Sequence, residues 1–223
     1  GTMTDARDGK KYKTVEICNE DKSLCQTWMA ENLNYADSVK TISLKGKSWC
    51  FDNKDANCDV TGRFYTWAAA IDSAALANDT ENPRICGYGQ SCDRLTSTAL
   101  AEAPIQGICP SGWHLPSKTE WQVLFTAVGG SGNAGKALKS GSGWYSNGNG
   151  TDAYGFSALP AGSGDYDGDF YGAGRSAYFW SATRYEYSCY YAFYMDLDYN
   201  YEYAYLGYGR KFNAFSIRCL KDD

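Results

Sequence analysis

The sequence predicts an α+β domain in which two main helices pack on small antiparallel sheets. Helical apolar patterns are confined to residues 62–140, whereas strand-like alternation occurs at 11–17 and in short runs after residue 141. Helices and strands segregated along a chain are typical of α+β folds. The 223 residues suffice for one substantial core, and no linker divides them.

The N-terminal part predicts a hairpin. Residues 11–17 alternate in the manner of a strand, residues 18–25 form a short polar loop, and apolar residues return at 26–33. We interpret residues 1–4 as an expression remnant and assign residues 5–223 to a single domain.

An alanine-rich helix is predicted from Gly62 to about Leu76. Its apolar face would carry Phe64, Trp67, Ala68 and Ile71.

A second helix is predicted after Pro116. Ser117 and Glu120 have the spacing of a capping box, and Gly129-Gly130 ends the helix. Its apolar stripe would consist of Trp121, Leu124, Phe125 and Val128. A short third helix is expected at residues 134–140.

The C-terminal part is unusual because ten of the nineteen tyrosines lie between Tyr185 and Tyr208. We call residues 184–211 the tyrosine ribbon. Within it, Met195 and Leu197 alternate with Tyr194, Asp196 and Asp198, which predicts a strand with one core face and one polar, aromatic face. A buried tyrosine needs a partner for its hydroxyl, so many of these rings are expected to be exposed.

Tyrosine is favoured at contact surfaces, because it combines a broad ring, a hydroxyl and few rotatable bonds. The ribbon is therefore predicted to bind a ligand, although a tyrosine-rich sheet with half its rings buried is the simpler alternative. The predicted contacts are Tyr185, Tyr187, Tyr190, Tyr194, Tyr199, Tyr201, Tyr203, Tyr205 and Tyr208, with Asp196, Asp198 and Arg210 adding charged hydrogen bonds.

Nine cysteines indicate disulfides and an oxidising compartment. Proximity favours three local bridges, Cys18–Cys25, Cys50–Cys58 and Cys86–Cys92. A long-range Cys109–Cys219 bridge then leaves Cys189 unpaired, although spacing alone allows many other connectivities. Zinc is disfavoured, because the chain has one histidine and no Cys-x-x-Cys pair.

The net charge of −5 and the absence of any run of Lys or Arg disfavour a nucleic-acid partner. No apolar stretch approaches the ~20 residues that span a bilayer, so direct membrane insertion is not expected. No cofactor is predicted. Residues 130–136 imitate a phosphate-binding loop, but Ala137 replaces its Ser or Thr and the segment follows a helix.

Five motifs resemble the Fibrobacter succinogenes major paralogous domain. They are YTWAAA at 65–70, CPSGWHLPS at 109–117, GFSALPAG at 155–162, FWSAT at 179–183 and FSIRC at 215–219. The resemblance implies a fold of the C-type-lectin or formylglycine-generating-enzyme type. It also implies a secreted or cell-surface bacterial protein, without an activity to carry over.

Two chemistries of those fold relatives lack their residues here. Formylglycine-generating enzymes need a close pair of reactive cysteines near the end of the domain, but Cys189 lies thirty residues before Cys219. Calcium-dependent lectins use Glu-Pro-Asn or Gln-Pro-Asp, whereas this chain has only Glu81-Asn82-Pro83. The ribbon instead occupies the place of the variable sites in lectin-fold proteins that diversify their surface.

Two further motifs have weak functional signals. Asp165, Asp167 and Asp169 offer alternating carboxylates for calcium, but the loop lacks the glycine and glutamate of an EF-hand, and a solvated turn is favoured. His114 has no partner at the spacing of a catalytic triad, so a structural role is expected.

The sequence thus predicts a non-enzymatic binding module for a glycan or a protein. Two alternatives stay open. One is a hydrolase of plant or microbial glycan that uses carboxylates from the ribbon, at Glu186, Asp196, Asp198 and Glu202, or from the loop at Asp165. The other is a structural surface protein that self-associates through its tyrosines.

Overall fold

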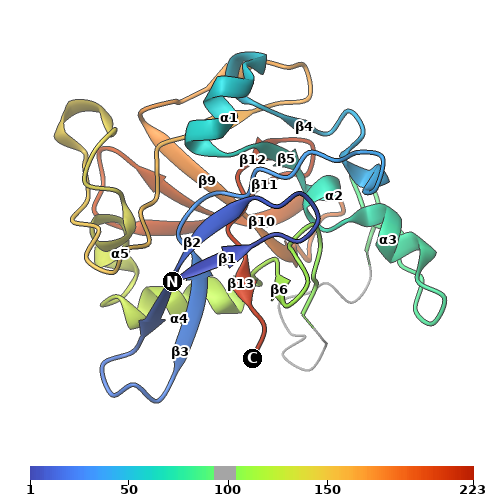
Figure 1. The fold of residues 1–223 in the computed structure, drawn as a ribbon. Coiled ribbons are helices and arrows are strands. Elements are labelled where there is room, and N and C mark those ends of the chain that lie inside the picture. The colour runs from blue at the N-terminus through green and yellow to red at the C-terminus, as the bar shows by residue number, and fades with distance from the viewer. Residues whose placement is uncertain (93–103) are drawn as a thin grey trace.

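The computed structural model describes residues 1–92 and 104–223, in which small antiparallel sheets are joined by short helices and long loops (Figure 1). One sheet has the strand order β1-β2-β3-β13-β6 and a second the order β4-β5-β12-β7-β8. These strands are β1 (Thr2–Thr4), β2 (Lys11–Cys18), β3 (Cys25–Met29), β4 (Ser48–Trp49), β5 (Phe64–Thr66), β6 (Trp113–His114), β7 (Ser163–Gly164), β8 (Phe170–Tyr171), β12 (Ala214–Phe215) and β13 (Leu220–Lys221).

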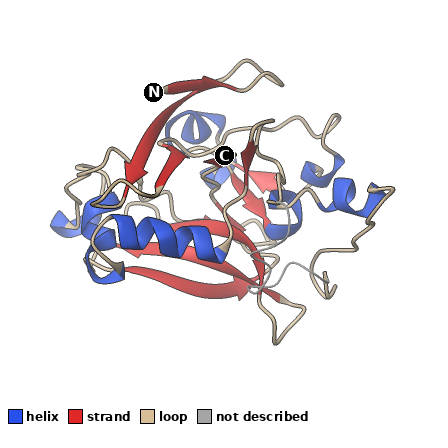
Figure 2. Cartoon of the chain, turned by 90° about the horizontal axis from the view of Figure 1, so that it is seen from below, coloured by secondary structure: helices blue, strands red, loops and turns tan. Residues whose placement is uncertain are grey.

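The third sheet is the ribbon with the strand before it, in the order β11-β10-β9. Its strands are β9 (Ser176–Arg184), β10 (Tyr191–Asp198) and β11 (Ala204–Arg210). The helices are α1 (Asp55–Thr61), α2 (Trp67–Ala70), α3 (Ser73–Asn78), α4 (Lys118–Ala127) and α5 (Ser131–Leu138), with 3-10 turns η1 (Ile42–Leu44), η2 (Phe51–Asn53) and η3 (Tyr145–Asn147). The predicted mixture of helices and antiparallel sheets is confirmed, and α4 runs along one face of the third sheet (Figure 2).

The predicted hairpin and the helix after Pro116 are confirmed. β2 pairs with β3 and the Cys18–Cys25 disulfide joins the pair at its end. In α4 the Ser117 hydroxyl accepts from Glu120 N, and the Glu120 carboxylate accepts from Ser117 N, which is the predicted capping box. α5 begins at Ser131, earlier than predicted. Thr2–Thr4, interpreted as a remnant, form β1 against β2.

The prediction of one helix over residues 62–76 is wrong. Phe64–Thr66 instead forms β5, the strand between β4 and β12. The Thr66 hydroxyl then accepts from Ala69 N and caps α2, and Asp72, at φ 49°, separates α2 from α3. The aromatic residues before Trp67 gain more by strand pairing in the core than by extending a helix.

All four predicted disulfides are present, and Cys189 is a free thiol. Cys109–Cys219 spans 110 residues and closes the longest loop. A long loop closed in this way restricts the unfolded chain most. Within the described residues, no helix is both long and apolar enough to cross a bilayer.

His114 ties the C-terminal segment to α4. Its Nδ1 lies 2.7 Å from Asp222 Oδ1 and its Nε2 lies 2.9 Å from Glu120 Oε1. Burial of the ring lowers the pKa of His114, but the hydrogen bonds and charges of Glu120 and Asp222 outweigh burial, so the pKa is raised. The ring thus links α4 to the segment that follows β13.

Candidate functional site

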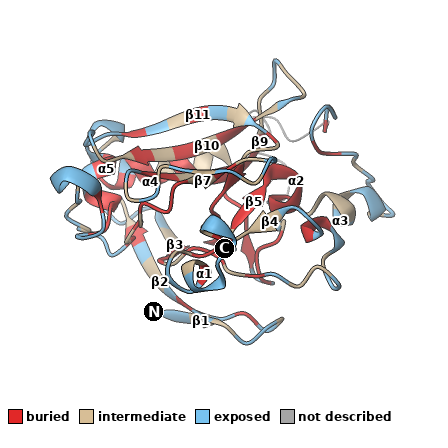
Figure 3. Cartoon of the chain, turned by 90° about the horizontal axis from the view of Figure 1, so that it is seen from above, coloured by how far each residue is buried: buried red, intermediate tan, exposed pale blue. Residues whose placement is uncertain are grey.

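The tyrosine ribbon has two faces, because β9, β10 and β11 pair antiparallel and successive side chains alternate. The covered face carries Phe179, Met195, Leu197 and Leu206, which pack with α4 and α5 in one apolar cluster. The other face, called the open face here, carries the alternate residues of the same strands; at its β9 side, Trp180 and Ala192 are buried in a second apolar cluster, and only the part toward β11 is exposed. Exposure rises from β9 through β10 to the edge strand β11 (Figure 3).

One row of the open face joins a carboxylate to two tyrosines. Asp196 is directly paired with Tyr178 on β9 and with Tyr205 on β11. Side chains that lie opposite one another in an antiparallel pair have Cβ atoms about 5 Å apart, so the three groups are neighbours. Tyr205 is 55% exposed, whereas Tyr178 and Asp196 are half-buried. A ligand on this row would meet a phenol ring and a carboxylate together.

The next row positions an aromatic ring beside the carboxylate. Tyr194 is paired with Trp180 and with Gly207, and its ring packs edge-on against Trp180 and Phe215. A Cβ on Gly207 would lie 2.9 Å from the Tyr194 hydroxyl. A side chain at position 207 would therefore displace the Tyr194 ring from its present position.

The ionised form of the Asp196 carboxyl group is disfavoured by its surroundings. Its Oδ1 is shielded from solvent and has no hydrogen-bond partner among the described residues. Burial, followed by the charge of Asp198, raises the pKa of Asp196 to about 6. Asp198 is better supported, since it accepts from Ser176 Oγ at 3.2 Å and from Asn200 N at 2.9 Å. Shielded carboxylates with raised pKa values are more frequent at functional sites than elsewhere.

A buried lysine, Lys139, fixes the turn between β10 and β11 through hydrogen bonds to its backbone. Lys139 Nζ donates to the carbonyl oxygens of Asp198 and Tyr201 at 3.0 and 2.9 Å, and it lies 5.1 Å from the Trp144 ring. Above this support, Tyr201 and Tyr203 stack with ring centroids 4.7 Å apart. The exposed rings at this end of the sheet are thus presented on a fixed backbone, which lowers the entropy lost on binding.

The other predicted contacts fall into separate groups. Tyr185 stacks on Tyr208 at 4.1 Å on the side of the covered face, where Lys118 lies over Phe193. Tyr199 packs edge-on against Tyr145. Tyr187 is 81% exposed at the end of the sheet.

Tyr190 and Arg210 belong to a further aromatic group. Tyr190 contacts Tyr88 at 5.0 Å, Tyr88 contacts Phe212 at 5.1 Å, and Arg210 lies over Phe212. The loop that carries Tyr88 is fixed by the Cys86–Cys92 disulfide and by Lys211, whose Nζ donates to Gly87 O and Gln90 O. The twelve predicted contacts therefore do not form one continuous surface.

Sequence reasoning missed several aromatic residues of these surfaces, and Tyr178 and Tyr88 show why. Tyr178 is two positions before Trp180, so the alternation that predicted β10 also indicates its face on β9. Tyr88 had no such signal, because its place beside Tyr190 depends on the position of a distant loop.

The loop at residues 165–169 is organised as a turn. Asp165 Oδ1 accepts from Asp167 N and Asp169 N, and the Tyr171 hydroxyl contacts the other Asp165 oxygen at 3.3 Å. In residues 1–92 and 104–223, the only three metal-ligating side chains with ligand atoms close enough to share an ion are Glu16, Cys18 and Cys25, and those cysteines form a disulfide. Calcium at Asp165, Asp167 and Asp169 was the weaker prediction and gains no support from this geometry.

Comparison with protein families identifies one match. The model of the Fibrobacter succinogenes major domain matches residues 25–221. This match covers the five sequence motifs that carry the resemblance. Comparisons with curated proteins and with solved structures find no significant match.

Proposed function

The chain belongs to the Fibrobacter succinogenes major domain family, and we propose that it is an exported binding module whose ligand is a glycan. The open face of the ribbon is the proposed contact surface, with Tyr194, Asp196, Tyr203 and Tyr205 at its centre. The four disulfides support an oxidising compartment outside the cytoplasm.

The observation that carries this proposal is the shielded carboxylate of Asp196 between aromatic neighbours. An ionised carboxylate accepts strong hydrogen bonds from hydroxyl groups, and sugars present hydroxyls along their edges. Sugar rings also have apolar C–H faces that pack on aromatic rings, as the exposed side of Tyr205 allows. A glycan can therefore bind a charged acceptor and an aromatic ring together, whereas a protein ligand has fewer adjacent hydroxyls.

We further propose a fold of the C-type-lectin or formylglycine-generating-enzyme type, with the ribbon as a diversified surface. The mixed helices and antiparallel sheets support it, as does the position of the ribbon just before the last strands. Diversification would be tolerated at Tyr201, Tyr203 and Tyr205, because their side chains are exposed on a backbone held by other residues.

A glycan hydrolase is the second candidate, favoured by the pKa of about 6 at Asp196. A carboxyl group with a raised pKa can donate a proton to a glycosidic oxygen, and Asp198 lies on the same face of β10 as a second carboxylate. Release of reducing sugar from a bound glycan, lost in Asp196→Asn, would favour hydrolysis over binding alone.

A glycan array tests the binding proposal. The wild-type domain is compared with a Tyr203→Ala/Tyr205→Ala variant, and Tyr187→Ala is the control because this ring is more exposed but lies off the open face. We expect glycan binding that only the double variant loses.

Three other results are informative. Binding to bacterial envelope proteins alone, lost in the same variant, would change the ligand class but keep the site. Equal binding by all three proteins would remove the open face as the site. Oligomers that grow with concentration and disappear in the double variant would favour self-association.

A further inference from the structure

A second candidate site lies away from the ribbon, in a hollow beside α1. Its volume is about 410 Å³, within the range of small-molecule pockets, which is roughly 300–1,000 Å³. The walls come from the start of β2, the segment after β3, the end of α1, the loop at residues 157–159 and Arg218. The lining residues include none of the tyrosine ribbon, residues 184–211. Ser157, Leu159 and Arg218 also belong to two of the motifs that characterise the family.

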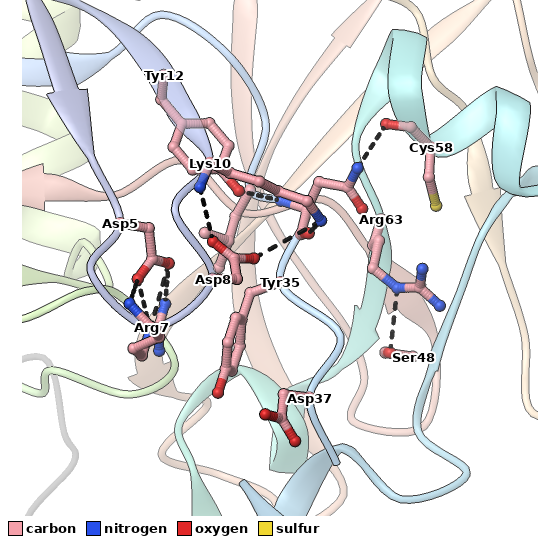
Figure 4. Close-up of polar contacts among 12 residues, drawn as sticks. Asp5, Arg7, Asp8, Lys10, Tyr12, Tyr35, Asp37, Ser48, Cys58 and Arg63 are labelled. Atoms are coloured by element: carbon pink, nitrogen blue, oxygen red, sulfur yellow. Dashed lines mark hydrogen bonds and ion pairs between the residues drawn. The ribbon is translucent and has the colours of Figure 1, made fainter. Parts of the chain in front are cut away.

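The lining is positively charged although the chain is acidic. The lining contains four basic side chains, those of Lys10, Lys11, Lys13 and Arg218, and two acidic ones, those of Glu31 and Asp59. The whole chain, by contrast, carries a net charge of −5. Lys10 is partly neutralised by Asp8 at 3.7 Å, outside the hollow (Figure 4). Lys11 and Lys13 are exposed and form no ion pair within the described part of the chain. Such an excess of positive charge attracts an anion.

The buried guanidinium of Arg218 contacts no acidic side chain in the part of the chain that the structure describes. The side chain is 1% exposed, and its guanidinium donates to Asn32 Oδ1 at 2.6 Å and to the carbonyl oxygens of Met29, Phe156 and Ser157. All four acceptors are uncharged, and no ion pair to Arg218 occurs among the described residues. Burial lowers the pKa of Arg218 to about 9, although the charges of Glu31 and Asp152 act in the opposite direction.

The remaining polar groups suit hydroxyls. The Tyr12 hydroxyl accepts from Asn34 N at 3.0 Å, and its own hydrogen has no acceptor in residues 1–92 or 104–223. Glu31 uses one carboxylate oxygen for Lys13 N at 2.7 Å, so its other oxygen can accept from a ligand. A site with cations on one side and such donors and acceptors beside them fits a molecule that carries both a carboxylate and hydroxyl groups.

The hollow continues along α1. A second hollow of about 510 Å³ shares Val60, Thr61 and Leu159 with the first and adds the apolar surfaces of Phe51 and Pro160. One ligand can therefore extend from the charged hollow over an apolar wall, as a chain of sugar rings does.

We infer that the hollow beside α1 binds a uronic acid, a sugar that carries a carboxylate, either free or as a unit of an acidic polysaccharide. The carboxylate lies toward Arg218, Lys11 and Lys13, and the hydroxyls bind Tyr12 and Glu31. This site is independent of the ribbon.

Isothermal titration of the intact domain with galacturonate and with neutral galactose tests the inference. Loss of charge-assisted hydrogen bonds weakens binding strongly, so galactose is expected to bind at least about tenfold more weakly than galacturonate. A trimer of galacturonate is expected to bind more tightly than the monomer, since it reaches the second hollow. Inorganic phosphate is the third probe, and binding as tight as that of galacturonate would overturn the role of the hydroxyls.

Two variants of the site leave the buried scaffold intact. Lys11→Gln/Lys13→Gln removes charge at the mouth, and Val60→Trp places a large ring at the junction of the hollows, where the valine is 71% exposed. Both are expected to weaken galacturonate binding at least about tenfold. The control is Lys22→Gln/Lys45→Gln, which removes the same charge from exposed positions elsewhere and should leave the affinity for galacturonate unchanged.

Three results would overturn the inference: no galacturonate binding by the wild type, equal affinity for galactose, or equal losses in the site variants and the lysine control. Tyr203→Ala/Tyr205→Ala should not change galacturonate affinity. If galacturonate affinity fell in that variant alone, the binding site for the uronic acid would be the ribbon and not the hollow.

Discussion

The two faces of β10 and β11 belong to the same strands but differ in burial and in their contribution to stability. Met195 and Leu197 are fully buried under α4 and α5, whereas Asp196 between them faces the open side, and its Oδ1 has no hydrogen-bond partner within residues 1–92 and 104–223. The covered face stabilises the sheet by burying apolar surface. The open face gives up stability, because a shielded carboxylate without a partner is costly. This difference is the basis of our proposal that the open face binds a ligand.

The largest effect should come from the covered face. Leu197→Ala is expected to lower the free energy of unfolding by about 2–5 kcal/mol, because it leaves a cavity under α5. Tyr205→Ala on the neighbouring strand should change it by less than about 0.5 kcal/mol, since the ring is largely in solvent. Urea unfolding of both variants measures the contrast, and similar losses would contradict the division between the faces.

At Asp196, next to Leu197, a substitution is expected to raise the free energy of unfolding rather than lower it. The folded pKa of Asp196, about 6, exceeds its ordinary value of 3.8, so the folded state holds the proton more tightly. Stability therefore falls as pH rises through this window, and the cost is complete above it. Asp196→Asn should raise the free energy of unfolding by about 1–2 kcal/mol near pH ~7.5 and change it little near pH ~4.

That variant should also lose glycan affinity, because the amide is a weaker acceptor than the carboxylate. A variant less stable than the wild type near neutral pH would show that Asp196 is supported by interactions other than those described.

The interactions of His114 with Glu120 and Asp222 should also make the free energy of unfolding depend on pH, by a similar or smaller amount. Its pKa is raised, so its stabilising interactions with Glu120 and Asp222 are complete below the unfolded pKa of about 6.5 and are lost as pH rises through the higher folded pKa. His114→Gln should therefore cost about 1 kcal/mol more near pH ~5.5 than near pH ~9. Comparing variant and wild type at each pH removes the contribution of Asp196. A pH-independent difference would argue against a charged imidazole.

Patterns close in sequence predicted the local structure well. The capping box of α4, the hairpin and the alternation of β10 depend on neighbours along the chain, and the structure agrees with them. The helix predicted over residues 62–76 failed, because the partners of β5 come from residues 48–49 and 214–215. Helical periodicity in a short apolar run cannot reveal such distant pairing.

The same limit applies to the sites. The ribbon is recognisable by composition, but its division into separate groups depends on how three strands pair and on where Lys139 and Lys211 hold the loops. The hollow beside α1 has no sequence signature, because its walls come from five distant segments. Lys10, Lys11 and Lys13 give no signal of such a site in the sequence, because Arg218, which lines the same hollow, is about 200 residues away along the chain.

Tyr205 and Tyr208 allow the most direct test of the central claim, since they lie on the same strand, on opposite faces, and are 55% and 49% exposed. The affinity of Tyr205→Ala and Tyr208→Ala for a glycan selected on the array should be measured against the wild type under one condition. We predict a loss of at least about tenfold for Tyr205→Ala, in the range of a contact residue at the centre of an interface, and less than about twofold for Tyr208→Ala. Equal losses, or a greater loss for Tyr208→Ala, would contradict recognition by the open face.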